Sequence, residues 1–328
     1  MQLVINSYGS YLRREKGCFV LKCEDKKQKI STRNIDSILV TTGAAISSDA
    51  IELALERNIE INFLNKYGDP IGKVWHSKLG STTYIRRRQL EISKTEEGTQ
   101  LVKELMIQKI DNCINHLKDL AKRRSKDKIE YLNDVISELT ELKKKMQSVT
   151  GLIDDVRSTL MGYEGNVAKK YFSALSYLLP DRYQFNGRTS RPAKDEFNCF
   201  LNYGYGILYS RVEKGCIISG LDPYVGILHT DGYNKMSFVF DMIEPFRVYV
   251  DRLVMKLFAA KTVKKRFFDN VYGGLTLNDE GKKYFIQHFN QYFDRKIRYR
   301  DRNIKLENII QFDCHRIANS LIEEEEDK

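Results

Sequence analysis

The sequence contains few residues that break or cross-link a chain, with 5 Pro, 20 Gly and 6 Cys among 328 residues. This content excludes collagen-like and low-complexity proteins, which need far more Gly and Pro. The length excludes a small disulfide-stapled domain. No two cysteines have the two-residue gap that is typical of a zinc knuckle. We therefore expect reduced thiols and assign no cysteine to a functional site.

Long uncharged apolar runs are also missing. Residues 238–250 are among the most apolar, yet Asp241, Glu244 and Arg247 interrupt them, whereas a membrane-spanning helix needs about 18 consecutive apolar residues. Residues 1–6 lack the basic and apolar segments of a secretory signal. We therefore expect no membrane partner and a cytoplasmic protein.

Positive charge exceeds negative charge, because 54 Lys and Arg face 44 Asp and Glu, for a net charge of +10. Residues 256–302 supply most of the excess, with 12 Lys or Arg against 5 Asp or Glu. Two clusters carry it, and their members are Lys261, Lys264, Lys265 and Arg266, then Arg295, Lys296, Arg298, Arg300 and Arg302. Since Lys and Arg neutralise phosphates of any base sequence, these clusters predict a DNA-binding surface.

The fold is predicted from the hydrophobic pattern. Short β-prone runs separated by turn residues fill the first 85 residues and favour an antiparallel meander, with one helix after Ser47 and a hairpin whose turn covers residues 66–70. From residue 84 to 146 there is no Pro, and apolar residues recur at steps of three and four, which predicts long helices. We predict an α+β protein: a β-rich domain over residues 1–85, then a larger, mostly α-helical domain over residues 86–328.

The predicted helices carry many charges. Residues 103–146 contain 11 Lys or Arg and 8 Asp or Glu. A nearly balanced mixture of this kind is typical of solvated helical faces with ion pairs. We therefore do not assign this stretch to the DNA-binding surface.

Glu164 is the first candidate for chemistry. It falls on or beside the apolar stripe of a predicted helix that includes Leu160, Val167 and Tyr171. Gly165 follows in the helix interior, where glycine costs about 1 kcal/mol relative to alanine. Close backbone packing or room for a ligand would explain that glycine. Taken alone, Glu164 has the simpler interpretation of a solvated or ion-paired carboxylate.

His229 is the second candidate. It is the single imidazole of residues 220–232, a stretch rich in Gly, Pro and Asp that predicts a loop. Neutral imidazole is a ligand for manganese or zinc and a base near neutral pH. Taken alone, a hydrogen-bonded structural histidine is the simpler interpretation.

Asp241 and Glu244 are the third candidates for chemistry. If a helix begins near Asp241, with Pro245 in its first turn, the two carboxylates lie close together. In apolar surroundings they repel each other unless a metal or an arginine such as Arg247 or Arg252 neutralises them. A plain capping box remains an alternative.

These segments occur in a set order after a β-rich domain. Tyr163-Glu164-Gly165 comes first, residues 220–229 follow, and residues 241–247 come last; secondary matches lie at residues 61–64, 188–192 and 198–206. In this order they resemble the CRISPR-associated protein one family, the integrase and endonuclease of spacer acquisition. The similarity spans nearly the whole chain.

The resemblance implies a metal site built from Glu164, His229 and Glu244, with Asp241 as a neighbouring or alternate ligand. Two carboxylates and one imidazole suit Mg²⁺ or Mn²⁺. It also implies the reaction, in which the 3′-hydroxyl of a short DNA duplex attacks phosphodiesters at each end of a repeat, so that a spacer enters the array. Arg188, Arg191 and Arg247 become further candidates for DNA contacts.

The resemblance further implies a homodimer that pairs through its β-rich domains, bound to double-stranded DNA and to a small second CRISPR adaptation subunit. Two alternatives stay open. The same residues with water as nucleophile would make a metal-dependent nuclease that acts on branched DNA in repair. A chain that binds DNA without turnover would be a non-catalytic scaffold.

Overall fold

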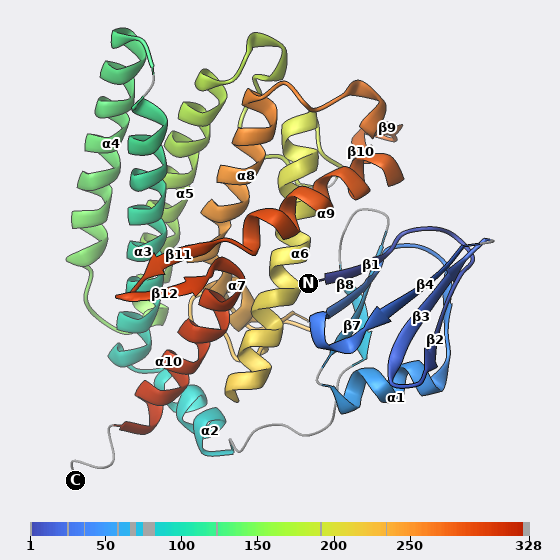
Figure 1. Ribbon diagram of the computed structural model, residues 1–328. Helices are drawn as coiled ribbons and strands as arrows, with labels where there is room; N and C mark the ends of the chain where they lie inside the picture. Colours follow the sequence, from blue (N-terminus) through green and yellow to red (C-terminus); the bar gives the residue numbers. More distant parts are fainter. Residues whose placement is uncertain are drawn as a thin grey trace.

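The computed structural model describes residues 2–24, 26–35, 37–57, 59–65, 70–74, 83–122, 124–190, 192–233 and 235–323. A strand-rich region precedes a mostly helical one, shown in blue and in green to red in Figure 1. The prediction of an α+β fold with this order is confirmed.

Two four-stranded sheets form the N-terminal region. Their strands are β1 (Gln2–Ile5), β2 (Ser10–Glu15), β3 (Cys18–Cys23), β4 (Lys26–Ser31), β5 (Ser37–Val40), β6 (Ala44–Ile46), β7 (Glu60–Leu64) and β8 (Pro70–Val74). The spatial orders are β4-β3-β2-β6 and β1-β5-β7-β8. A core of buried apolar side chains, with Phe19, Ile38 and Leu53 among them, stabilises this region.

The expected antiparallel meander is found only in β2, β3 and β4. Strands β1, β5 and β7 are parallel, and β6 is parallel to β2. Parallel neighbours need long crossovers, and here β2 to β4 lie between β1 and β5 along the chain. The polar strand β4 pairs with β3 alone and buries only Ile30, so it has no alternating pattern by which to recognise it.

Two local predictions for this region are confirmed. Helix α1 (Ser48–Glu56) begins after Ser47, whose hydroxyl accepts a hydrogen bond from the Ala50 N–H at 3.2 Å. Strands β7 and β8 form the expected antiparallel hairpin. Residues 66–69 of its predicted turn lie outside the described residues.

The helical region contains α2 (Thr83–Ile92), α3 (Glu96–Ala121), α4 (Lys126–Gln147), α5 (Ile153–Leu178), α6 (Glu196–Ser219), α7 (Ser237–Ile243), α8 (Arg247–Ala259), α9 (Asp279–Phe293) and α10 (Ile309–Glu323). Single 3₁₀ turns are η1 (Thr32–Asn34), η2 (Asp181–Tyr183), η3 (Glu244–Phe246), η4 (Lys265–Phe267) and η5 (Leu306–Asn308). The long helices α3, α4 and α5 lie side by side in Figure 1.

Close packing against α6 depends on Gly204. A Cβ atom there would lie 2.5 Å from Val250 Cγ1 and 2.8 Å from Phe285 Cζ, inside van der Waals contact. The missing side chain lets α8 and α9 approach α6. Since α8 follows directly on η3, which Glu244 begins, this packing helps to fix one candidate site residue.

The basic stretch 256–302 begins in the last turn of α8, and two short hairpins joined by α9 follow its first basic cluster. The first is β9 (Phe268–Val271) with β10 (Gly274–Leu277), and the second is β11 (Lys296–Tyr299) with β12 (Arg302–Lys305). The hairpins lie at opposite ends of α9 (Figure 1). Its 15 residues make these ends about 20 Å apart, so the two basic clusters are separate surfaces.

Across the residues that the structure describes, we find no helix with the length and apolar character needed to cross a membrane. All six cysteines are free thiols, as expected, and four of them are buried.

Candidate active site

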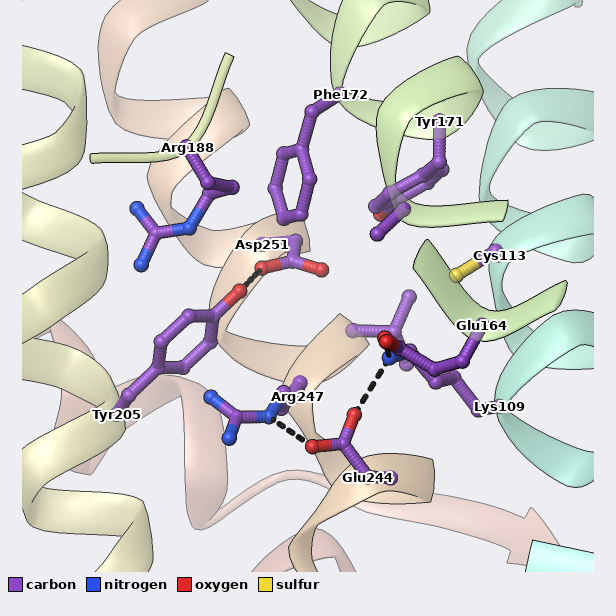
Figure 2. A pocket seen from close by; sticks show the side chains of 12 residues that line it. Lys109, Cys113, Glu164, Tyr171, Phe172, Arg188, Tyr205, Glu244, Arg247 and Asp251 are labelled. Carbon is purple, nitrogen blue, oxygen red and sulfur yellow. Dashed lines mark hydrogen bonds and ion pairs between the residues drawn. The ribbon is translucent and has the colours of Figure 1, made fainter. Parts of the chain in front are cut away.

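Two predicted site residues, Glu164 and Glu244, meet at a lysine that the sequence did not single out. Lys109 Nζ of α3 donates a hydrogen bond to Glu164 Oε1 of α5, and a second one, of 2.6 Å, to Glu244 Oε2 of η3. Figure 2 shows the three side chains converging. Two carboxylates from separate helices thus share one cation.

Local sequence explains why these groups face inward. Lys109 lies one helical turn from Met106 and from Cys113, both buried on the stripe of α3 that packs into the core. Glu164 follows Leu160 by four residues and precedes Val167 by three, and both neighbours are buried. Their carboxylate and ammonium groups are therefore placed between packed helices, where they need each other as partners.

The break at Pro245 positions Glu244. Proline has no N–H and cannot continue α-helical hydrogen bonding, and α7 ends just before the 3₁₀ turn η3, which Glu244 begins. Asn112 Nδ2 of α3 donates a 2.8 Å hydrogen bond to the Pro245 carbonyl and ties this break to α3. The predicted helix start near Asp241 is wrong, because α7 already begins at Ser237.

The charges of this cluster stabilise one another. Burial would raise the pKa of Glu244, but Arg247 and Lys109 outweigh it, so this pKa lies well below its ordinary value. Burial would lower the pKa of Lys109, but Glu244 and Glu164 outweigh it, so this pKa is raised. Both groups are therefore ionised at neutral pH.

A cavity of about 200 Å³ extends from the carboxylates into the helical region. Arg247 lines it, donates from Nε to Glu244 Oε1 at 2.9 Å, and has its guanidinium 4.8 Å from the Tyr205 ring centre. Arg188 also lines it, and its guanidinium hydrogen-bonds to the amide oxygens of Asn198 and Asn202. The cavity thus combines three acidic side chains, of Glu164, Glu244 and Asp251, with three cationic ones.

Tyr205 and Asp251 are buried titratable groups that also line the cavity. Tyr205 donates a 2.5 Å hydrogen bond to Asp251, and burial raises the pKa of Asp251 to about 6. Tyr171 also lines the cavity, and its hydroxyl lies 2.7 Å from Nδ1 of the buried His116. Burial, with the nearby charge of Arg252, lowers the pKa of His116 to about 3.

His229 and Asp241 form a second unit. The fully buried Asp241 carboxylate accepts hydrogen bonds from the backbone N–H groups of Ile227, Leu228 and His229, at 2.7, 3.1 and 3.0 Å. It also lies 2.6 Å from His229 Nδ1. Asp241 therefore holds the loop between α6 and α7 and orients the imidazole, rather than capping its own helix.

The donor set fits a divalent cation in part. Glu164 and Glu244 offer the oxygen ligands that Mg²⁺ and Mn²⁺ prefer, and the Nδ1 contact of His229 leaves Nε2 as its metal-binding nitrogen. Within the described ranges, however, no three His, Cys, Asp or Glu side chains gather closely enough to hold a metal. Lys109 holds the place between the carboxylates, and His229 is not among the cavity-lining residues.

The predicted DNA-binding residues fall into three groups. Arg188 and Arg247 line the cavity, and Arg191 lies outside the described residues. The exposed residues of the first basic cluster, Lys261, Lys264, Lys265 and Arg266, lie between α8 and β9. Those of the second, Arg295, Lys296 and Arg298, lie at β11, whose Tyr299 hydroxyl contacts Gln108, the neighbour of Lys109.

Sequence reasoning missed Lys109, Tyr205 and Asp251. Lys109 belongs to the stretch interpreted as solvated, and that interpretation is wrong for Lys109 and for the buried Lys103. A lysine between Met106, Ile110 and Cys113 on an apolar stripe was the available signal. Nothing in the sequence pairs Tyr205 with Asp251, which are 46 residues apart.

Comparison with solved structures places this fold in a known class. A CAS1 protein from Thermotoga maritima superposes with a TM-score of 0.83 at 25% identity, over 98% of this chain and 97% of that one. A casposase bound to integration product has the same TM-score at 20% identity, over 99% of this chain and 91% of that one, and so shares the fold.

Sequence comparison then gives the family. Residues 3–291 match the family described as CRISPR associated protein Cas1. A protein of Archaeoglobus fulgidus named CRISPR-associated endonuclease Cas1 1 is 34% identical over 322 residues, which cover 94% of this chain and 93% of that protein. The chain belongs to the Cas1 family.

Proposed function

We propose that this chain is a metal-dependent DNA integrase and endonuclease of CRISPR adaptation. It would insert short duplexes into the repeat array by 3′-hydroxyl attack on target phosphodiesters. The observation that carries the proposal is the convergence of Glu164 and Glu244 on one cation in a cavity that Arg188 and Arg247 also line. The relative named an endonuclease and the casposase solved with an integration product support it.

The chain's own residues have separate roles in this proposal. Glu164, Glu244 and His229 would hold Mg²⁺ or Mn²⁺, which, when bound, activates the attacking hydroxyl and offsets charge on the leaving oxygen. Asp241 orients His229 through the Nδ1 contact. Arg247 fixes Glu244, and with Arg188 it would bind the phosphate of the strand that enters the cavity.

The surface beside Glu164 leaves room for a DNA backbone. Cβ atoms built on Gly162 and Gly165 would meet no atom within 4 Å. Close helix packing therefore does not explain Gly165, and we propose access by a ligand as the reason for it. We propose that DNA approaches α5 on this side, held by the exposed cations of the two basic clusters.

The remaining assignments are also proposals. Residues 1–85 would form the dimerisation domain and residues 86–328 the catalytic domain, although α2 already begins at Thr83. The separate core of the strand-rich region supports a unit of its own. Two-fold pairing is the commonest symmetry for such a unit. The partners would be double-stranded DNA and the small second adaptation subunit, in the cytoplasm.

The test is a strand-transfer reaction. A labelled short duplex with free 3′-hydroxyls is incubated with the protein, the small subunit, Mn²⁺ or Mg²⁺ and a supercoiled plasmid that carries a repeat. We expect label covalently joined to the plasmid. Nicked plasmid without joined label would favour a nuclease that uses water, and DNA binding without either product would favour a non-catalytic scaffold.

A further inference from the structure

Lys109 holds a position that the proposed metal would need. Its Nζ contacts one oxygen of each carboxylate, and its side chain is 11% exposed. We propose that Lys109 is the resident counter-ion of the site, which a divalent cation displaces on binding, so that Lys109 sets the affinity for the metal. This inference rests on the proposed function, because it concerns the metal site assigned there.

Lys109 and a metal bound by both carboxylates would need the same position. Glu244 Oε1 accepts from Arg247 and Glu244 Oε2 accepts from Lys109, so both oxygens have a cationic partner. A metal that binds Glu164 and Glu244 together must lie between them, about 2.1 Å from each ligand oxygen. The Lys109 ammonium lies between the same side chains. An ammonium and a divalent ion cannot share that space, because like charges at such a distance repel strongly.

The cavity can accept the Lys109 ammonium when a metal displaces it. Lys109 lines the 200 Å³ cavity, and a lysine stem has four rotatable bonds, so its ammonium can leave the carboxylates while α3 stays in place. Before metal binds, Lys109 offsets the repulsion between Glu164 and Glu244. Without Lys109 that repulsion would remain, and a metal would relieve it more strongly.

The experiment measures Mn²⁺ binding by isothermal titration calorimetry to the purified full chain. The variants are Lys109→Met and Lys109→Gln. Lys143→Met is the matched control, since Lys143 also pairs with a carboxylate, lying 2.6 and 2.8 Å from the two oxygens of Asp111. We expect both Lys109 variants to bind Mn²⁺ at least about tenfold more tightly than wild type. The control should bind as wild type does.

A merely structural lysine would give the opposite result, since its loss would disorder the ligands and weaken binding. Equal or weaker Mn²⁺ binding by folded Lys109 variants therefore overturns the inference while the metal site stands. If neither wild type nor any variant binds Mn²⁺, both the site and the inference are wrong. Binding is measured without DNA, so failure of strand transfer alone leaves this result unaffected.

A measurement on the unmodified chain covers the case in which the variants do not fold. Lysine acylation is followed by mass spectrometry with Mn²⁺ and with a chelator. Displacement should raise the acylation of Lys109 about threefold or more in Mn²⁺, with Lys143 unchanged. Equal acylation of Lys109 in both conditions would overturn the inference.

Discussion

Replacing Asp241 with asparagine should loosen the loop that carries His229. The carboxylate accepts hydrogen bonds from three backbone N–H groups and lies 2.6 Å from His229 Nδ1. An asparagine side chain has one acceptor oxygen and one amide that donates. In the wild type, one carboxylate oxygen accepts from the Ile227 and Leu228 N–H groups, and the other contacts the His229 N–H and Nδ1. Whichever way the asparagine amide is turned, its NH₂ group replaces one of these oxygens and faces a pair of donors.

The magnitude follows from burial. Ile227 and Leu228 are 2% and 1% exposed, and a buried donor left without an acceptor costs about 1–3 kcal/mol. Two such donors make local opening of the loop easier by about 3 kcal/mol, which corresponds to about 100-fold faster amide exchange. Since His229 loses its orienting partner, we also expect metal affinity to fall by about 10- to 100-fold.

The assay is hydrogen–deuterium exchange of peptides that contain residues 227–229, in wild type, Asp241→Asn and the control Asp231→Asn. Asp231 accepts a single 3.1 Å hydrogen bond, from the Gly226 N–H in the same loop. The control should leave residues 227–229 protected, and core amides of α3 should exchange equally in all three proteins. Wild-type protection of residues 227–229 in Asp241→Asn would refute the role given to Asp241.

Three further predictions concern stability and DNA. First, folded His116 has a pKa of about 3 against 6.5 for the ordinary group, so its contribution to stability is present above pH 6.5 and is lost as pH falls from 6.5 toward 3. Wild type should lose about 2 kcal/mol more than His116→Asn between pH 7 and 5. Second, Gly204→Ala should destabilise the protein by about 1–3 kcal/mol through overpacking, whereas Gly162→Ala, which meets open space, should stabilise it by about 0.5–1 kcal/mol. Third, Lys296→Ala with Arg298→Ala should reduce the salt dependence of DNA binding by about two units of slope.

Urea unfolding and DNA titrations check these three. Asp251 changes the pH dependence of stability in the opposite direction to His116. Its pKa is raised to about 6, so its protonation below that pH favours the folded state. The comparison with His116→Asn removes this effect, since both proteins contain Asp251. Parallel pH profiles of wild type and His116→Asn, or equal stability of the two glycine variants, would contradict the first two predictions. The third would be contradicted if replacing two exposed lysines of α4 reduced the salt slope as much as replacing Lys296 and Arg298.

The sequence indicated the acidic residues of the site because their neighbours form ordered motifs. Glu164 falls on a helical stripe, and Glu244 precedes Pro245, so both positions can be read locally. The helical character of residues 161–172 and the loop over residues 220–232 were predictable for the same reason. The assignment of Glu164, His229 and Glu244 to a metal stays a prediction.

What could not be predicted depends on contacts between distant segments. Lys109 meets Glu164 and Glu244 across 55 and 135 residues of chain, and its lysine-rich surroundings hid the apolar stripe on which it lies. Asp241 was placed at a helix start, but the returning loop supplies N–H donors that no local pattern reveals. The two hairpins were missed because their strands are four residues long and lie mostly at the surface, so they show no clear alternation.

The central claim is tested most directly by strand transfer with Glu164→Gln beside Glu138→Gln, both checked for folding. Glu138 pairs with Lys170 at 2.7 Å and is a surface carboxylate. With Mn²⁺, the small subunit and a repeat-bearing plasmid, wild type and Glu138→Gln should join labelled duplex to the plasmid, and Glu164→Gln should join none. Undiminished joining by Glu164→Gln, or no joining by wild type, would contradict the account.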